Sequence, residues 1–511
     1  MQFNLVNYFL DRNLDEGRGE KTAVFYRDEK ISYAEVARRT NQAANLLVSL
    51  GLRIEERVLN IIPDCPEFAY FWFGEIKAGG IAASVNTILT EEDYDYYLNY
   101  TRAAFCVVHP SAWEKVKNVY KNARFLKGII FLGELHDPKN KIFSYDKMRD
   151  ECSTSFATAP TTEDDMAVWL FTSGTTGKAK AAMHFHHDFV FNTENYAKKV
   201  LQIRESDVTA SVPKLFFGYA TGTNLMFPFA VGASTVLFDE RSTPEKLFEV
   251  IEKYRPTIIT NVPTMINAML QHPDQAKFDL SSVRLVLSAG EALPEELYRR
   301  WKTRTGVEIL DGIGSAEMFH IYISNYPGDV KPGSLGKLVP GYSARIVGPD
   351  GADVKTGEIG TLHICGDSAA LGYFGDHKKS KATFAGDWNF TEDQFSQDAD
   401  GYFYYHGRKD DMLKVSGIFV SPLEIENCLL THEAIAECAV VAAEDEAGVT
   451  KPKAYIVLKQ GQVLTQAEIT EHVKKHLAPY KYPRMVEFVA SLPKNERGKV
   501  DRKLIRQTPA A

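Results

Sequence analysis

The sequence has few cysteines, no excess of basic charge and no long uninterrupted apolar run, and each absence excludes a class of protein. The six cysteines of the 511-residue chain stand singly, without a C-x-x-C pair, so we expect free thiols rather than a disulfide framework or a zinc site. A formal net charge of −8 argues against a nucleic acid or an anionic membrane as partner of the whole chain. The first residues lack a basic and apolar secretory leader, so we expect a cytoplasmic protein.

One uncharged stretch, residues 215–238, resembles a membrane helix and contains a G-x-x-x-G motif at Gly218 and Gly222. Polar residues and Pro228 interrupt the apolar run. We therefore predict no membrane span, but a short buried helix, a turn near Gly232 and a buried strand over 234–238.

Short apolar runs alternate with helical stretches over most of the chain. This alternation predicts an α/β protein with parallel sheets flanked by helices. The strands are expected at 57–62, 81–85, 105–108, 257–261, 283–288 and 307–310, with helices at 68–78, 243–253 and 295–303. Residues 342–347 and 360–364, with their Gly- and Pro-rich turns, indicate antiparallel strands. The length exceeds that of one ordinary core, so at least two domains are expected.

The last hundred residues predict a separate small α+β domain. Two capping boxes, Ser421–Glu424 and Thr465–Glu468, begin helices, and strands are expected at 438–443, 454–459 and 485–489. The charged stretch 407–411 precedes this unit and is typical of a linker between moving domains.

The richest chemical motif lies at residues 171–180, which read FTSGTTGKAK. Its glycines allow a tight turn, its hydroxyls add donors, and Lys178 and Lys180 add positive charge, so the loop suits a polyphosphate. The spacing differs from that of a Walker A loop. On local sequence alone, a flexible polar loop remains an alternative.

Three further segments carry residues suited to ligand binding. The predicted strand at 307–310 runs into 311–317 (DGIGSAE), where Glu317 stands at the third glycine position of a dinucleotide fingerprint and instead suits Mg²⁺ beside a triphosphate. Gly290, after the strand at 283–288, permits a flat ring to approach the backbone. Lys499 follows a flexible glycine near the C-terminus and could reach an anionic site. The histidines at 184, 186 and 187 lack zinc-site spacing and are read as core or loop residues.

These motifs in this order, with Glu392-Asp393 and 407–411 between them, resemble the adenylate-forming superfamily of acyl-CoA synthetases, luciferase and adenylation domains. Segments 214–219 (KLFFGY), 311–325, 411–422, 450–455 and 477–484 are most similar to benzoate-CoA ligase and related aryl-CoA ligases. The resemblance implies a large N-terminal domain over 1–409, with parallel sheets and a distorted β-barrel. It also implies a mobile C-terminal lid over 411–511, with its hinge at Asp410.

The resemblance also implies the substrates and the residues that bind them. The expected substrates are ATP with Mg²⁺, coenzyme A and a benzoate-like aromatic or alicyclic acid such as cyclohexenecarboxylate. The catalytic residues implied are Thr172, Glu317, which also holds the metal, and Lys499. The ATP and AMP contacts implied are Thr172, Ser173, Gly174, Thr175, Thr176, Gly177, Lys178, Gly290, Glu291, Ala292, Asp311, Gly312, Ile313, Gly314, Ser315, Asp393 and Arg408.

The acid and the thiol have their own implied contacts. The acid pocket consists of Phe216, Gly218, Tyr219, Phe319, His320 and Ile321, and the CoA step uses Lys414, Ser416 and Gly417. The sequence departs from the family pattern at Ala179, Ala181 and Glu392, and Gly218 and Phe319 reshape the pocket. A carrier-protein loader is an alternative, as are a luciferase-like oxidase, a nucleotide-binding protein without turnover and a NAD-dependent dehydrogenase. The protein is expected to be a monomer or homodimer.

Overall fold

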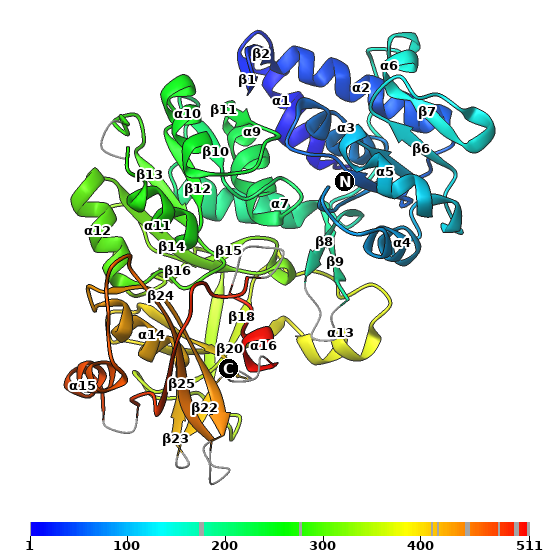
Figure 1. The fold of residues 1–511 in the computed structure, drawn as a ribbon. Helices are drawn as coiled ribbons and strands as arrows, with labels where there is room; N and C mark the ends of the chain where they lie inside the picture. Colours follow the sequence, from blue (N-terminus) through cyan, green and yellow to red (C-terminus); the bar gives the residue numbers. More distant parts are fainter. Residues whose placement is uncertain are drawn as a thin grey trace.

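The computed structural model describes residues 2–172, 178–274, 278–409, 412–415, 418–444, 450–478, 481–494 and 500–507. Within them the chain forms a large N-terminal α/β domain and a smaller C-terminal domain, seen at the lower left of Figure 1. No helix among these residues has the length and apolar character needed to cross a membrane.

The first large sheet is mostly parallel. Its strand order is β16-β15-β14-β13-β12-β10-β11-β1-β2, and the six strands from β14 to β1 are parallel, while β2, β15 and β16 pair antiparallel at the edges. The strands are β1 (Thr22–Tyr26), β2 (Glu29–Ser32), β10 (Val208–Ser211), β11 (Ser234–Leu237), β12 (Ile258–Asn261), β13 (Leu285–Ser288), β14 (Glu308–Gly314), β15 (Ile321–Ser324) and β16 (Lys337–Leu338).

The second large sheet has the order β7-β6-β5-β3-β4-β8-β9 and is parallel except for the last strand, which returns antiparallel to β8. The strands are β3 (Arg57–Ile61), β4 (Ile81–Ser84), β5 (Phe105–Val108), β6 (Gly128–Phe131), β7 (Ile142–Ser144), β8 (Met166–Thr172) and β9 (Lys180–Phe185). Strands β8 and β9 therefore bring Thr172 and Lys180 of the 171–180 motif side by side at the edge of the sheet.

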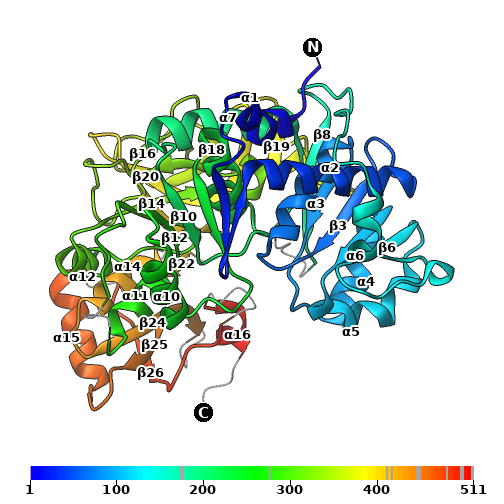
Figure 2. The same ribbon diagram turned by 90° about the horizontal axis from the view of Figure 1, so that it is seen from above.

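Helices fill the space between and around these sheets, as the view from above shows (Figure 2). Helix α3 is buried along nearly its whole length, and its Phe73 ring stacks on Phe229 of α9 at 5.6 Å. The helices of the large domain are α1 (Arg12–Asp15), α2 (Tyr33–Ser49), α3 (Pro66–Lys77), α4 (Glu91–Tyr100), α5 (Pro110–Val119), α6 (Tyr145–Met148), α7 (His186–Asn192), α8 (Gly218–Thr221), α9 (Phe227–Val231), α10 (Pro244–Tyr254), α11 (Pro263–Gln271), α12 (Glu295–Thr305) and α13 (His377–Thr383), with π-helical turns η1 (Asn7–Asp11), η5 (Thr193–Val200) and η6 (Gly222–Met226).

A third, antiparallel sheet links the large sheets to the small domain. It contains β17 (Ser343–Val347), β18 (Gly360–Cys365), β19 (Phe384–Ala385), β20 (Trp388–Gln397) and β21 (Phe403–Arg408). The small domain has β22 (Leu413–Val415), β23 (Ile418–Val420), α14 (Pro422–Leu430), β24 (Ile435–Glu444), β25 (Thr450–Leu458), α15 (Gln466–His476), β26 (Met485–Phe488) and α16 (Arg502–Gln507).

The sequence predictions for these elements are largely confirmed. The 215–238 stretch forms α8, η6 and α9, then a left-handed turn at Gly232 (φ 71°) and the buried strand β11. Thr465 and Glu468 form a complete capping box. Two predictions need correction. Ser421 caps α14, but the Glu424 side chain pairs with Lys481 instead of closing a box. The strand predicted at 307–310 continues through Gly314, because residues 312–314 pair with β15.

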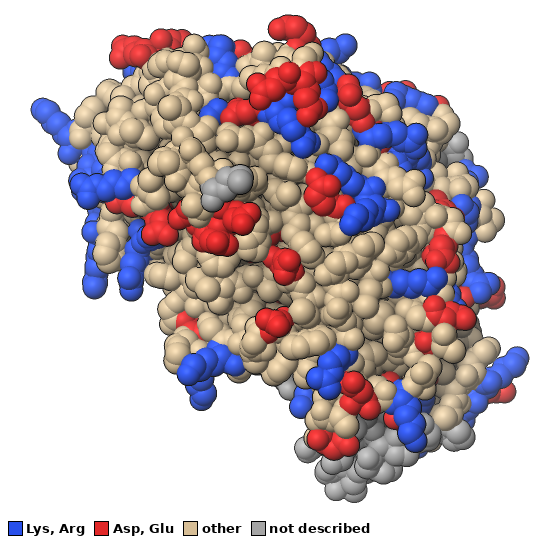
Figure 3. All heavy atoms as spheres, turned by 180° about the vertical axis from the view of Figure 1, so that it is seen from behind, with Lys and Arg blue, Asp and Glu red and all other residues tan. Residues whose placement is uncertain are grey.

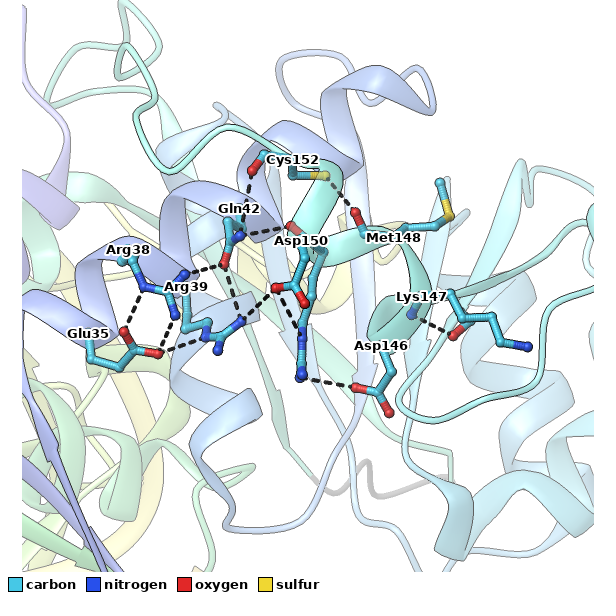
Figure 4. Close-up of polar contacts among 11 residues, drawn as sticks. Glu35, Arg38, Arg39, Gln42, Asp146, Lys147, Met148, Asp150 and Cys152 are labelled. Atoms are coloured by element: carbon cyan, nitrogen blue, oxygen red, sulfur yellow. Dashed lines mark hydrogen bonds and ion pairs between the residues drawn. The ribbon is translucent and has the colours of Figure 1, made fainter.

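Polar contacts at the periphery hold α2 to the segment after α6, far from the small domain (Figure 4). The Gln42 side chain donates to the backbone oxygen of Arg149 at 2.8 Å, and Glu35 pairs with Arg38 and Arg39 on the same helix. On the face seen in Figure 3, acidic and basic side chains are interspersed. This mixture agrees with the modest net charge and shows no continuous basic surface on that face.

Candidate active site

A cleft of about 800 Å³ lies between the two domains. The large domain supplies the end of β8, the start of β9, residues after β13, the 312–317 segment and the strands β20 and β21. The small domain supplies α14, β24 and residues beside α16. Among the residues of this wall are Thr172, Lys180, Gly290, Glu291, Ala292, Gly312, Ile313, Gly314, Ser315, Glu317, Tyr373, Asp393, Arg408, Glu426, Lys494, Val500 and Arg502. Segments more than 300 positions apart thus meet here.

The β8–β9 hairpin brings polar groups to one end of the cleft. Thr172 and Lys180 are direct partners across the hairpin, and the Lys180 Nζ lies 2.7 Å from Asp376 Oδ2. Lys178 is exposed, with its ammonium 5.2 Å from the centre of the Tyr96 ring, and it is not part of the cleft wall. Residues Ser173, Gly174, Thr175, Thr176 and Gly177 lie outside the described residues.

Glu317 lies on the cleft wall in a single 3₁₀ turn after β14. Its Oε1 accepts a hydrogen bond from the Tyr373 hydroxyl at 2.7 Å, which fixes the carboxylate while leaving oxygen lone pairs for a ligand. Mg²⁺ is usually held by one or two carboxylates together with substrate phosphates, so one anchored carboxylate beside Thr172 and Lys180 fits a Mg²⁺–triphosphate.

A buried histidine contacts the 3₁₀ turn that contains Glu317. His184 Nε2 lies 2.6 Å from the backbone oxygen of Ala316, and its Nδ1 lies 2.7 Å from Asp188 Oδ2. Both His184 and Asp188 are fully buried. The burial of His184 confirms the prediction of a core histidine. The sequence did not reveal its contact with Ala316, the residue before Glu317. No helical spacing marks this contact in the sequence, because His184 lies in β9 and Asp188 in the first turn of α7.

A strained turn separates Glu317 from the predicted acid pocket. Phe319 has φ 66° and ψ −58°, and the His320 N–H donates to the Met318 oxygen at 2.8 Å. This geometry is a γ-turn with positive φ, which is rare for a residue with a side chain. Surrounding packing must hold it, and the Phe319 ring contacts Phe189 at 4.5 Å between centroids.

The predicted adenine-binding residues come together along one side of the cleft. Gly290 has φ 85°, a conformation that glycine adopts at no steric cost, and Glu291 accepts from the hydroxyl of Thr264 at 2.8 Å. Asp311 differs, because it is 5% exposed and does not line the cleft. Burial raises the pKa of Asp311 to about 8, so it is mostly uncharged at neutral pH.

Asp393 and Arg408 face each other on β20 and β21 as direct partners. Arg408 Nε lies 3.9 Å from Asp393 Oδ1, but its Nη2 is 2.7 Å from Glu392 Oε2. Glu392 also pairs with Lys379 at 2.7 Å. Burial raises the pKa of Asp393 to about 6, against the opposing effect of Arg408. The unusual Glu392 thus competes with Asp393 for the arginine.

The six predicted acid-pocket residues form one group but do not line the cleft wall. A Cβ on Gly218 would lie 3.3 Å from the backbone oxygen of Phe319, and His320 Nε2 lies 3.0 Å from the Tyr219 oxygen. Phe319, His320 and Ile321 are each 2% exposed, whereas Phe216 is partly exposed. Burial lowers the pKa of His320 to about 3, so this imidazole is neutral.

The small-domain wall is organised by a buried ion pair. Glu426 on α14 accepts from Arg502 Nη2 at 2.8 and 2.7 Å, and its Oε1 also accepts from the Val440 N–H. Lys494 and Val500 form an isolated bridge that borders the cleft. Asp410, Ser416, Gly417 and Lys499 lie outside the described residues, and Lys414 lies in β22.

Comparison with known proteins agrees with this arrangement. The family model "AMP-binding enzyme" matches residues 10–374, and "AMP-binding enzyme C-terminal domain" matches residues 424–499. The chain therefore belongs to the AMP-binding enzyme family, and it is an AMP-forming acyl- or aryl-CoA synthetase.

Its relatives and structural neighbours include ligases of ring carboxylic acids. The chain is 43% identical to a benzoate–CoA ligase of Thauera aromatica, over 99% of this chain and 96% of that protein. It is 37% identical to a 4-hydroxybenzoate–CoA/benzoate–CoA ligase of Rhodopseudomonas palustris, over 99% of this chain and 94% of that protein. An anthranilate CoA ligase solved with anthranoyl-AMP superposes with a TM-score of 0.94 at 40% identity, covering 99% and 97% of the two chains. A benzoate CoA ligase from Burkholderia xenovorans superposes with a TM-score of 0.90 at 36% sequence identity, covering 99% of this chain and 100% of that chain.

Proposed function

We propose that this enzyme uses ATP to join a benzoate-like ring carboxylic acid to coenzyme A through an acyl-adenylate. The observation that carries the proposal is the interdomain cleft, in which Thr172, Lys180 and the anchored Glu317 face residues of the small domain. Relatives that are ligases of benzoate and hydroxybenzoate support the substrate class.

In the first step, a carboxylate oxygen of the acid attacks the α-phosphorus of ATP and pyrophosphate leaves. Both reactants are anions, so the enzyme must supply positive charge and hold the atoms in line. We assign the 172–180 hairpin to the β- and γ-phosphates, Gly290–Ala292 to adenine and Asp393 to the ribose hydroxyls. Glu317 would hold Mg²⁺, which neutralises phosphate charge when bound.

Lys499 is assigned to the carboxylate and the α-phosphate during adenylation. Its neighbours support this role, because Lys494 and Val500 both border the cleft. In the second step the CoA thiol attacks the acyl carbon and AMP leaves, which requires Lys499 to withdraw. Rotation of the small domain at Asp410 would then bring Lys414, Ser416 and Gly417 to the cleft.

We assign the acid to the group formed by residues 216–219 and 319–321. Its lining of aromatic rings and a neutral imidazole favours a flat or alicyclic ring, and it contains no carboxylate to pair with an α-amino group. Hydrophobic contacts separate similar rings by only about 1–3 kcal/mol per methylene, so several ring acids are expected to react.

A substrate panel tests the proposal. Purified enzyme with ATP and Mg²⁺ is given benzoate, hydroxy- and aminobenzoates, cyclohexenecarboxylate, an amino acid and a long-chain fatty acid, with and without CoA. AMP release should require a ring acid, and its rate should increase when CoA is present, with acyl-CoA as product. Turnover that ignores CoA but responds to a carrier protein would favour the loader alternative. No AMP release with any acid would contradict the proposal.

A further inference from the structure

A cluster of thiol and imidazole groups lies at the meeting point of two small-domain helices. The Cys428 thiol, His472 and His476 place one ligand atom each within 4.8 Å of one another. Cys428 is buried on α14, whereas His472 is partly exposed and His476 is exposed on α15. No reaction step assigned above uses these side chains.

The helices present these residues on matching faces. His472 and His476 are four positions apart on α15 and so share one side of that helix, while His432 lies just beyond the end of α14, four positions after Cys428. The rings of His472 and His476 are 4.7 Å apart, and those of His432 and His472 are 5.0 Å apart. A tetrahedral zinc site has ligand atoms roughly 3.4–3.6 Å apart, given the usual zinc–nitrogen and zinc–sulfur distances, so small side-chain rotations would close this cluster on an ion.

The backbone around the cluster favours a bound cation. The cluster lies at the C-terminal ends of both helices, where the exposed carbonyl oxygens carry partial negative charge. His472 Nε2 lies 3.0 Å from the backbone oxygen of Cys428 and 2.9 Å from Thr431 Oγ1, so the end of α14 already holds this ring beside the Cys428 thiol. The exposure of His476 leaves an entry path from solvent.

We propose that Cys428, His472 and His476 form a site for a thiophilic divalent cation of the zinc class, with His432 or water in the fourth position. Bound metal ties the C-terminal end of α14 to that of α15 within the small domain. The residues from Leu430 to Glu433, just after Cys428, border the interdomain cleft, so the ion braces one edge of the small-domain wall. The singly placed cysteines concealed this site in the sequence, because its ligands come from two helices that lie apart along the chain.

Metal binding to the full-length enzyme tests the site. After removal of metals with a chelator, the protein is titrated with Co²⁺ and then with Zn²⁺. We expect one equivalent of either ion, a thiolate-to-cobalt charge-transfer band that zinc abolishes, and a Zn²⁺-dependent rise in Tm. Cys428→Ser should abolish the charge-transfer band, and His476→Gln, at an exposed position, should weaken zinc binding at least tenfold and remove the Tm rise.

Matched controls are Cys152→Ser, which removes a partly exposed thiol of the segment after α6 (Figure 4), and His377→Gln, which removes an exposed histidine on α13. Both should bind zinc as the parent does. The proposal is overturned if the parent shows no thiolate–cobalt band, or if Cys428→Ser and His476→Gln, both folded by circular dichroism, retain the parent's zinc affinity.

Discussion

The two walls of the cleft are each held together by contacts within their own domain, but the sheets that support them differ in size. On the large-domain wall, Glu317 in the turn after β14 is fixed by Tyr373, and Lys180 at the start of β9 is fixed by Asp376, so both contacts lie beside strands of the two wide sheets. On the small-domain wall, Arg502 is fixed by Glu426 and Lys494 by Glu437, around a three-stranded sheet. Because neither set of pairs crosses the cleft, withdrawal of the small wall would leave the contacts that fix Glu317 and Lys180 intact.

The largest effect on the difference between the two walls is expected from Lys499→Ala. If the small wall supplies charge only for adenylation, this variant should lose roughly 10²–10³-fold in pyrophosphate exchange, the scale of one lost charge-stabilising group. It should still convert supplied acyl-AMP and CoA to the thioester at nearly the parent rate. An equal loss in both half-reactions would contradict the division of labour between the walls.

The buried pair on the small wall gives the next largest effect. Arg502→Met leaves Glu426, whose side chain is 8% exposed, without its arginine, which should destabilise the small domain by about 3 kcal/mol. Limited proteolysis should then cut the C-terminal hundred residues first. The double variant Arg502→Met/Glu426→Gln is the control, and its loss should be smaller because no unpaired carboxylate remains. Equal losses would show that the unpaired carboxylate adds nothing to the loss of the ion pair.

Acidification tests the large wall. Asp393, with a pKa of about 6, must be ionised to accept two ribose hydroxyls, so KM for ATP should rise up to tenfold per pH unit below pH 6. Its folded-state pKa lies above that of an unfolded aspartate, so protonation stabilises the fold as the pH falls from about 6 towards 4, and the loss is one of binding. Asp393→Asn should show a high KM without this pH dependence. If KM for ATP in Asp393→Asn rises below pH 6 as it does in the parent, the titrating group is not Asp393.

The smallest effect is expected from Glu392→Gly. Glu392 holds both Arg408 and Lys379, and partly exposed pairs of this kind contribute about 0–1 kcal/mol. Its removal should release Arg408 towards Asp393 and change KM for ATP by less than about fivefold. Glu358→Gly, at an exposed carboxylate in a loop away from the cleft wall, is the control. A change beyond tenfold would mean that Glu392 itself contacts the nucleotide.

Much of the fold could be predicted from the sequence because periodicity and capping are local. The strand at 105–108 and the helix after Thr465 were predicted with correct bounds or caps. The extension of β14 through Gly314 could not be predicted, since it depends on pairing with β15, and glycine-rich segments usually end strands. Tyr373 and Asp376 were missed for a similar reason. They reach Glu317 and Lys180 from a distant loop, and no local pattern marks such a contact.

The γ-turn at Phe319 connects two proposed binding sites through a single residue. Glu317 precedes it by two positions, and the segment proposed to bind the ring begins at Phe319 itself, so the carboxylate proposed to hold Mg²⁺ and the proposed acid site share one strained turn. A substitution that resizes the pocket at this point would also tilt the carboxylate. Gly218 reaches the same turn from the opposite side, because an added Cβ there would lie 3.3 Å from the Phe319 backbone oxygen and 3.2 Å from Leu170, close enough that a neighbour must shift. Reshaping the proposed ring site from either side therefore acts on the backbone of one residue, two positions after Glu317.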